Sequence, residues 1–303
     1  MIFVEKVWNM HGSYPQSVHK VDGIVDRSQD LVANIRLIPY IRKETDGRKA
    51  QKVDNVEKDQ KSTQERVDNL HIEDLRLIQS EETFRYGIDA VLLSGYAGRK
   101  VKAKDRIMDI GTGNGAVAIM MSKTKAGCID GLEIQDKAAE MARRNVILNG
   151  LQGRVNIYTG DVKSLPQDLP KNTYNMVVTN PPYMARKGAI SNEQPEKAIA
   201  RHEIACTVDD VIDGARRLLK SNGLFYMIHR PHRLVDIFSS MRKHDIEPKE
   251  MILIRPRADK PPNLVLIEGR KGAGAELSIK EWTVYKEDGS YTDTILDIYK
   301  GAI

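Results

Sequence analysis

The stretch RIMDIGTGNG, residues 106–115, predicts the fold of this chain. Residues 106–110 form a short apolar run typical of a buried strand. The glycines that follow permit a tight turn and let a ligand approach the backbone closely. Residues 116–123, AVAIMMSK, are apolar enough for the next helix. A strand, a glycine-rich turn and a helix in this order indicate an α/β sheet.

The glycine turn alone is compatible with two cofactors. Gly111, Gly113 and Ala116 satisfy the dinucleotide pattern G-x-G-x-x-G/A. Residues 129–134 predict the second strand, and Glu133 near its end could accept hydrogen bonds from both hydroxyls of a ribose. The glycines and the acid therefore leave both NAD and S-adenosylmethionine open.

The alternation of strands and helices continues to the end of the chain. Ahead of the glycine turn we expect a helical lead-in at 67–70, a strand at 75–79 and a helix at 90–97 capped by Asp89. Behind it we expect strands at 154–159, 174–179, 224–229, 250–254 and 264–268, and helices at 137–149, 208–220, 230–243 and 292–299. No helical run separates the strands at 250–254 and 264–268, so they should pair as an antiparallel hairpin. The prediction is an α/β three-layer sandwich with a seven-stranded sheet.

Asn180-Pro181-Pro182-Tyr183 is a second informative stretch, because it follows the apolar run at 174–179. The prolines end the strand and stiffen the chain at the carboxyl end of the sheet, where open α/β sheets bind ligands. A planar amine is a poor nucleophile because its lone pair is delocalised. The Asn180 side-chain oxygen and the Pro181 carbonyl could each accept one N–H of such an amine and favour a tetrahedral nitrogen. Tyr183 offers a flat face for stacking, although the stretch could also be an ordinary turn.

Two resemblances favour S-adenosylmethionine over NAD. The stretch at 180–183 resembles the signature of amino-group methyltransferases that use S-adenosylmethionine. Asp109, two residues before Gly111, resembles the first residue of the methyltransferase motif D-x-G-x-G-x-G. In that fold Asp161 lies where the adenine amine of the cofactor is commonly contacted.

Composition sets limits on partners and on location. The chain has 303 residues, 41% of them hydrophobic and 29% charged, with a net charge of +5 and a pI near 9.0. This mild basicity permits a nucleic-acid partner without requiring one. The two cysteines form no Cys-x-x-Cys pair, so no metal site is implied and a reducing cytoplasm is the simplest location. No apolar run reaches membrane-spanning length.

The N-terminal residues differ from the rest. Residues 42–66 include 14 charged residues of both signs among 25, too polar to bury a core. We expect residues 1–62 to form a flexible extension and residues 63–303 to form a methyltransferase domain. The extension could instead be a solvated helix, an RNA-binding arm, or sequence upstream of the natural start.

From about residue 63 to 301 the chain resembles the bacterial tRNA(Val) adenine-37 N(6)-methyltransferase family. The resemblance is carried in order by LRLIQSEETFRYGIDAVLLSGYA, DIGTGNGAVAIMMS, GLEIQDKAAEMARRNVILNGL, TNPPYMARKG, AIARHEIACTVDDVI, MIHRPHRLVDIFSSMRKHDIEPK and NLVLIEGRKG. It implies a class I methyltransferase fold and methyl transfer to an adenine amine in the tRNA anticodon loop, with the catalytic stretch at 180–183. The cofactor site it implies, together with the motifs above, comprises Tyr86, Asp89, Asp109, Gly111, Thr112, Gly113, Gly115, Glu133, Ile134, Asp161, Val162 and Asn180.

Three alternatives stay open at this point. A protein glutamine N5-methyltransferase would share the stretch at 180–183, because an amide nitrogen needs the same activation. A ribosomal-RNA guanine N2-methyltransferase has a similar fold but usually carries Phe after the prolines. A catalytically silent RNA-binding module would not need Asp109, Glu133 and Asn180 together.

Overall fold

The glycine turn follows β3, Arg106–Ile110, which lies within an eight-stranded sheet of the computed structural model. The structure describes residues 65–80, 86–181 and 206–299, all of which fall in the unit Thr63–Ile303. The strand order is β10-β8-β9-β7-β6-β3-β4-β5. The other strands are β4 Cys128–Glu133, β5 Val155–Thr159, β6 Tyr174–Thr179, β7 Leu219–His229, β8 Ile246–Arg255, β9 Leu264–Lys271 and β10 Ser278–Thr283.

The direction of these strands places most of their ends together. Every neighbouring pair is parallel except the two pairs made by β9, which runs antiparallel to β7 and to β8. All strands but β9 therefore end at one edge of the sheet, which we call the carboxyl edge. The predicted antiparallel pairing of β8 and β9 is confirmed, and their connecting loop, residues 256–263, also lies at the carboxyl edge.

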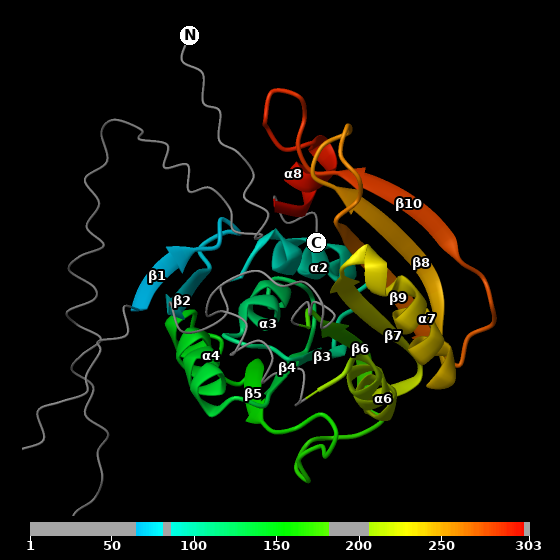
Figure 1. The fold of residues 1–303 in the computed structure, drawn as a ribbon. Coiled ribbons are helices and arrows are strands. Elements are labelled where there is room, and N and C mark those ends of the chain that lie inside the picture. The colour runs from blue at the N-terminus through cyan, green and yellow to red at the C-terminus, as the bar shows by residue number, and fades with distance from the viewer. Residues whose placement is uncertain (1–64, 81–85, 182–205, 300–303) are drawn as a thin grey trace, which may run out of the picture. The chain divides into compact units, whose positions relative to one another are not determined.

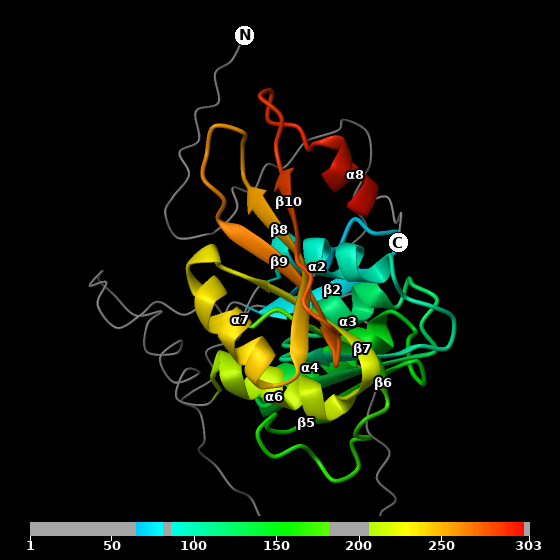
Figure 2. The same ribbon diagram turned by 90° about the vertical axis from the view of Figure 1, so that its right-hand side faces the viewer.

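Helices cover both faces of the sheet and make a three-layer sandwich (Figure 1). One hydrophobic core lies under α2 Ile88–Gly98, α3 Ala116–Met121, α4 Asp136–Leu148 and α8 Asp293–Tyr299. A second core lies under α6 Val208–Leu218 and α7 Leu234–Lys243. Figure 2 shows α7 and α8 on opposite sides of β8, β9 and β10. Side chains alternate along a strand, so Val178 of β6 enters the first core and Val177 enters the second.

A separate two-stranded sheet precedes α2. It pairs β1 Glu65–Asn69 with β2 Arg76–Ser80 in antiparallel register. The helical lead-in predicted at 67–70 is therefore wrong. The β1 residues are largely exposed and bury little apolar surface, and pairing with the buried β2 determines their conformation.

Two further predictions are corrected by the structure. The sheet has eight strands, not seven, because β10 adds to the outer edge of β8 in parallel. Most β10 side chains are exposed, so this strand carries no buried apolar run by which the sequence could reveal it. The N-cap of α2 is Gly87, and Asp89 lies within the first turn of the helix instead of capping it.

Some predictions concern residues outside the described part of the chain. They include the N-terminal extension 1–62, the domain boundary between residues 62 and 63, and the side chains of Pro182 and Tyr183. Within the described residues, no helix is both long enough and apolar enough to cross a membrane.

Candidate functional site

The glycine turn forms an open cradle at the end of β3. The amides of Gly111 and Thr112 donate to the carbonyl of Leu132 at 2.8 and 3.1 Å, which ties the turn to β4. Gly111 and Gly113 have φ angles of 71° and 57°, in the left-handed region that favours glycine. A Cβ at either glycine would meet no protein atom within 4 Å, so the turn borders open space where a ligand can contact its backbone.

Glu133 lies beside this cradle, at the end of β4. Its Oε2 accepts a hydrogen bond from the Gly113 amide and its Oε1 accepts one from the Gln135 amide, both at 2.9 Å. Glu133 is only 5% exposed, and these two hydrogen bonds fix the orientation of its carboxylate. Each oxygen has further lone-pair capacity, which fits the vicinal hydroxyls of a ribose.

Asp109, near the end of β3, is hydrogen-bonded to the glycine turn. It is 1% exposed, and its Oδ2 accepts a 2.6 Å hydrogen bond from the Thr112 hydroxyl. Burial raises the pKa of Asp109 to about 7, against the opposing effect of hydrogen bonds from Thr112 and from the Ala118 amide. The nearby charge of Glu133 raises the pKa further. Asp109 is thus a buried acid that can change its charge near neutral pH.

Asn180 and Pro181 follow β6, the strand next to β3. Ile110 pairs with Thr179, the last residues of adjacent strands that lie about 4.8 Å apart, and Gly111 and Asn180 directly follow them. The Thr179 hydroxyl donates to the Ile110 carbonyl at 2.9 Å and holds the two strand ends together. The predicted catalytic amide and the predicted cofactor turn are therefore neighbours at the carboxyl edge.

The remaining predicted residues lie around this centre at different depths. Asp161 follows β5, and its Oδ1 accepts a 2.9 Å hydrogen bond from the Lys163 amide. Val162 is buried in the core under α6, so only its main chain can face a ligand. Ile134 is 42% exposed directly after Glu133. Tyr86 and Asp89 lie at the start of α2, where the Tyr86 amide donates to Gln79 Oε1 of β2 at 3.1 Å.

Comparison with known families identifies this arrangement. Residues 90–244 match the model of the methyltransferase small domain, which is more than half of the chain. The chain belongs to the methyltransferase small domain family. Its methyl donor is S-adenosylmethionine, and the open glycine turn beside a fixed carboxylate fits the nucleoside part of that donor.

Curated relatives of this methyltransferase share most of its length. A tRNA1(Val) (adenine(37)-N6)-methyltransferase of Proteus mirabilis is 29% identical over 69% of this chain and 82% of the relative. One of Parabacteroides distasonis, bearing the same name, is 26% identical over 71% of this chain and 89% of the relative. Among solved structures, a predicted O-methyltransferase of Agrobacterium tumefaciens has a TM-score of 0.57 and 23% identity, covering 70% of this chain and 96% of that one. The structural likeness confirms the class I methyltransferase fold.

Two asparagines that the sequence analysis did not single out lie next to the candidate site: Asn145 of α4 and Asn149, the C-cap residue of that helix. The buried Asn145 accepts from the Ile78 amide at 2.6 Å and donates to the carbonyls of Ile78 and Asn114 at 3.1 and 2.9 Å. One helical turn later, Asn149 makes the same pair of bonds to Arg76, at 2.9 and 2.7 Å. Both side chains bind β2 as a neighbouring strand would, and Asn145 also holds the glycine turn at Asn114. Their spacing of four residues puts both side chains on one face of the helix, but this spacing alone does not distinguish them from ordinary helix residues.

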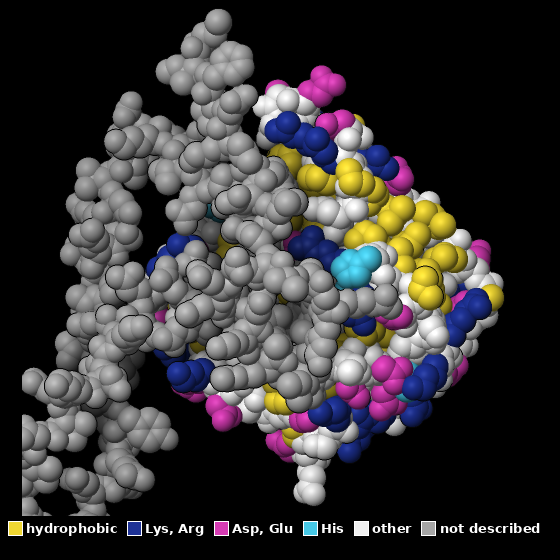
Figure 3. Space-filling view, viewed as in Figure 1, with side chains coloured by type: hydrophobic (Ala, Val, Ile, Leu, Met, Phe, Trp, Pro, Cys, Tyr) yellow, Lys and Arg dark blue, Asp and Glu magenta, His cyan; other side chains and the backbone are white. Residues whose placement is uncertain are grey.

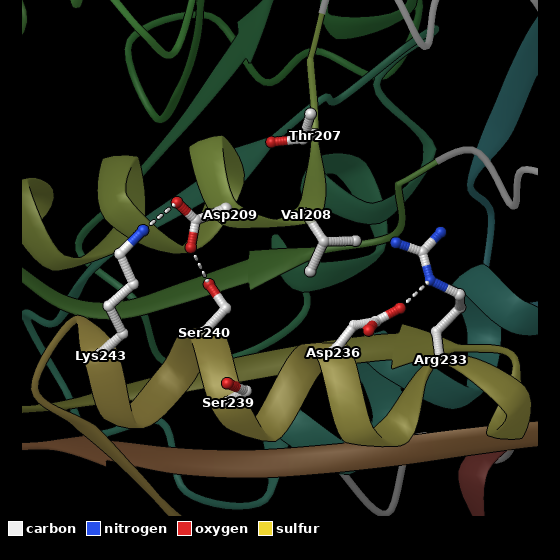
Figure 4. A pocket seen from close by; sticks show the side chains of 8 residues that line it. All are labelled: Thr207, Val208, Asp209, Arg233, Asp236, Ser239, Ser240 and Lys243. Atoms are coloured by element: carbon white, nitrogen blue, oxygen red, sulfur yellow. Dashed lines mark hydrogen bonds and ion pairs between the residues drawn. The ribbon is translucent and has the colours of Figure 1, made fainter.

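A hollow of the methyltransferase lies between the start of α6 and α7, and none of its lining residues is a predicted cofactor residue (Figure 4). Asp209 occupies its wall and accepts hydrogen bonds from Lys243 and Ser240, both at 2.7 Å, and contacts His244 at 3.0 Å. The bonds from Lys243 and Ser240 lower the pKa of Asp209 to about 2. These contacts join the two helices, and we assign the hollow a packing role. It is lined by Thr207, Val208, Asp209, Arg233, Asp236, Ser239, Ser240 and Lys243.

Proposed function

We propose that this methyltransferase modifies the exocyclic N6 amine of an adenine in tRNA, namely adenine 37 in the anticodon loop of tRNA(Val). The observation that carries the proposal is the position of Asn180 and Pro181 next to the glycine turn, on adjacent strands of the carboxyl edge. An amine acceptor and a methyl donor can meet there. The names of the curated relatives support an adenine of tRNA as the acceptor.

The cofactor half of the site binds the donor through rigid groups. S-adenosylmethionine supplies the methyl group on a positively charged sulfonium. We assign the ribose hydroxyls to Glu133, whose oxygens are already oriented by the Gly113 and Gln135 amides. The backbone of Gly111 and Gly113 offers close approach without side-chain clashes. Little rearrangement is then needed on binding, which favours affinity.

Asn180 and Pro181 would activate the acceptor amine. The Asn180 Oδ1 and the Pro181 carbonyl each accept one N–H of the adenine amine, so its lone pair turns toward the methyl group. As the new N–C bond forms and the S–C bond breaks, positive charge develops on nitrogen and both hydrogen bonds strengthen. The nitrogen then loses one proton to solvent, leaving N6-methyladenine and S-adenosylhomocysteine.

Pro182 and Tyr183 complete the proposed catalytic stretch, although they lie outside the described residues. We propose that Pro182 stiffens the chain after Pro181 and that the Tyr183 ring stacks on the target base. A base in an anticodon loop is not paired in a duplex, so presenting it to the enzyme requires little unstacking energy.

Nucleoside mass spectrometry of tRNA incubated with the protein and S-adenosylmethionine tests this function. We expect N6-methyladenosine in a valine tRNA transcript and no product when position 37 is guanine. Equal methylation of the guanine transcript would contradict the adenine assignment. Methylation of a release-factor glutamine peptide, with tRNA unmodified, would assign the protein to the glutamine N5-methyltransferases instead.

We further propose that residues 63–303 suffice for this reaction and that residues 1–62 are dispensable. All predicted site residues lie in the later segment, and the earlier one has a nearly balanced charge. A protein that starts at Thr63 should keep its melting temperature and turnover. Loss of activity with intact donor binding would show that residues 1–62 contribute to tRNA docking.

A further inference from the structure

The loops at the carboxyl edge differ in charge on the two sides of Asn180. On the side of β4 and β5, the loops carry Asp136, Asp161 and Lys163 in addition to Glu133 at the strand end. On the side of β7 and β9 the prevailing charge is positive. We call the five side chains on that side the basic rim: Arg230, His232, Arg233, Arg257 and Lys260. Figure 3 shows basic and histidine side chains close together near the start of α7.

The loop between β8 and β9 presents its part of the basic rim on a fixed turn. The Lys260 amide donates to the Arg257 carbonyl at 3.0 Å, which closes a four-residue turn with both side chains exposed. Two prolines follow and restrict the backbone. The Arg230 guanidinium of the β7 end donates to the Asn263 carbonyl at 3.0 Å, so the two parts of the rim are joined.

Two cations of the rim have acidic partners, whereas Arg257 has none among the described residues. Arg233 pairs with Asp236 at 2.9 Å, and Lys260 lies 3.3 Å from Asp259. Arg257 makes no ion pair with any residue in the described ranges. Lys260 is exposed and Arg233 is partly covered with an exposed partner, Asp236, so both ion pairs are open to solvent, where such pairs are weak and can exchange for a phosphate. The basic rim is therefore suited to a polyanion that lies along the surface.

We propose that the basic rim binds the RNA backbone next to the nucleotide that is methylated, an inference that rests on the proposed tRNA function. β6, β7, β9 and β8 are successive neighbours in the sheet, so the rim begins one strand from β6 and extends to two or three strands from it, about 10 to 14 Å across the sheet. Phosphates are recognised through charge and hydrogen bonds from arginine and lysine, and such contacts orient a nucleic acid without reading its sequence. The rim would thus set the direction in which the RNA enters the site.

Charge reversal at the exposed turn tests this assignment in the full-length protein. The variant R257E/K260E should bind a valine tRNA transcript about 10 to 30 times more weakly at 0.15 M salt, the effect of losing roughly two phosphate contacts. The slope of log affinity against log salt concentration should become shallower by about 1.4 to 1.8. The matched control K102E/K125E makes the same charge change in exposed loops at the opposite edge of the sheet, and it should keep most of its tRNA affinity and its salt slope.

Donor affinity, measured by calorimetry, should be unchanged in both variants, which shows that the fold is intact. If R257E/K260E folds poorly, R257Q/K260Q removes the charges with less repulsion and should give a smaller loss in the same direction. Equal tRNA affinity for R257E/K260E and K102E/K125E would overturn the rim assignment while the methylation activity of the natural sequence stood. Absence of tRNA binding and methylation by the natural sequence would instead overturn the proposed function itself.

Discussion

The two halves of the carboxyl edge differ in the burial and the charge of their side chains. The half that we propose binds the cofactor, called the cofactor half, lies at the ends of β3, β4 and β5 and holds Asp109 and Glu133 in buried positions fixed by hydrogen bonds of 2.6 and 2.9 Å. The substrate half, at the ends of β6 and β7 and in the β8–β9 loop, carries exposed cations such as Arg257 and Lys260. The donor is a small cation that needs an exact fit. The proposed acceptor is a large polyanion that needs an accessible surface.

Asn180 lies at the boundary of the two halves, and its removal should give the largest effect. We expect Asn180→Ala to lower kcat about a hundredfold, as does loss of one hydrogen-bonding group that acts mainly in a transition state. Donor affinity should change much less than kcat, because the main role assigned to Asn180 is activation of the amine, although the residue also borders the predicted cofactor site. Steady-state methylation and calorimetry separate these quantities. Full activity of the variant would contradict the proposed activation of the amine.

Glu133 gives the matching test of the cofactor half. Loss of hydrogen bonds to a charged group costs roughly 1.5–3 kcal/mol, so Glu133→Ala should weaken S-adenosylmethionine binding about tenfold or more. Affinity for tRNA should not change, since Glu133 lies apart from the basic rim. Glu133→Gln, which keeps the size and one acceptor oxygen, should lose less. Unchanged donor affinity in a folded Glu133→Ala variant would remove this residue from the site.

Asn145 and Asn149 test how the cofactor half is held in place. Both bind the β2 backbone, but only Asn145 also reaches the glycine turn, at the Asn114 carbonyl. Each alanine variant leaves backbone groups of β2 unpaired and should lower the free energy of unfolding by about 1–3 kcal/mol. Only Asn145→Ala should also weaken donor binding, by several-fold. Thermal melts measure the loss of stability, and calorimetry measures the donor affinity. An equal change of donor affinity in the two variants would show that Asn145 does not act on donor binding through the glycine turn.

The same comparison explains how much the sequence could predict. The glycine turn and the position of Glu133 at the end of β4 were predictable because they follow local patterns: a strand, three glycines in a short turn and an acid at the next strand end. The predicted succession of strands along the chain, from β3 to β9, is confirmed for the same reason. By contrast, β1 and β10 were missed because their own side chains are mostly exposed and their conformation depends on pairing with β2 and β8.

The basic rim of the proposed substrate half could not be predicted from the sequence, for a related reason. Arg230 and the β8–β9 loop are far apart in the chain, and Arg230 reaches Asn263 of that loop only because β7 and β9 pair. Asn145 was likewise indistinguishable from an ordinary helix residue until its contact with Asn114 was known. Local chemistry can be inferred from spacing, whereas a surface made by several segments requires the register of the sheet.

The smallest expected effect is a pH dependence that belongs to the cofactor half alone. Asp109 has a pKa raised to about 7 by burial, whereas burial lowers the pKa of His229 at the end of β7 to about 4. Between pH 6 and 8, Asp109 therefore gains its negative charge and His229 stays neutral. The raised pKa means that the folded state favours protonated Asp109, so its contribution to the free energy of unfolding is lost as pH rises from about 4 through 7. Donor binding should change in the opposite sense, because the sulfonium is attracted to the ionised carboxylate.

We expect the affinity for S-adenosylmethionine to rise roughly threefold from pH 6 to pH 8, for a charge coupling of about 1 kcal/mol. Calorimetric titrations at pH 6, 7 and 8 measure it. Asp109→Asn removes the titrating group and should flatten the profile, and His229→Gln should leave the rise in place because His229 carries no charge in this range. If donor affinity rose equally with pH in Asp109→Asn, another group would be the one that titrates, and the charge of Asp109 would not control donor binding.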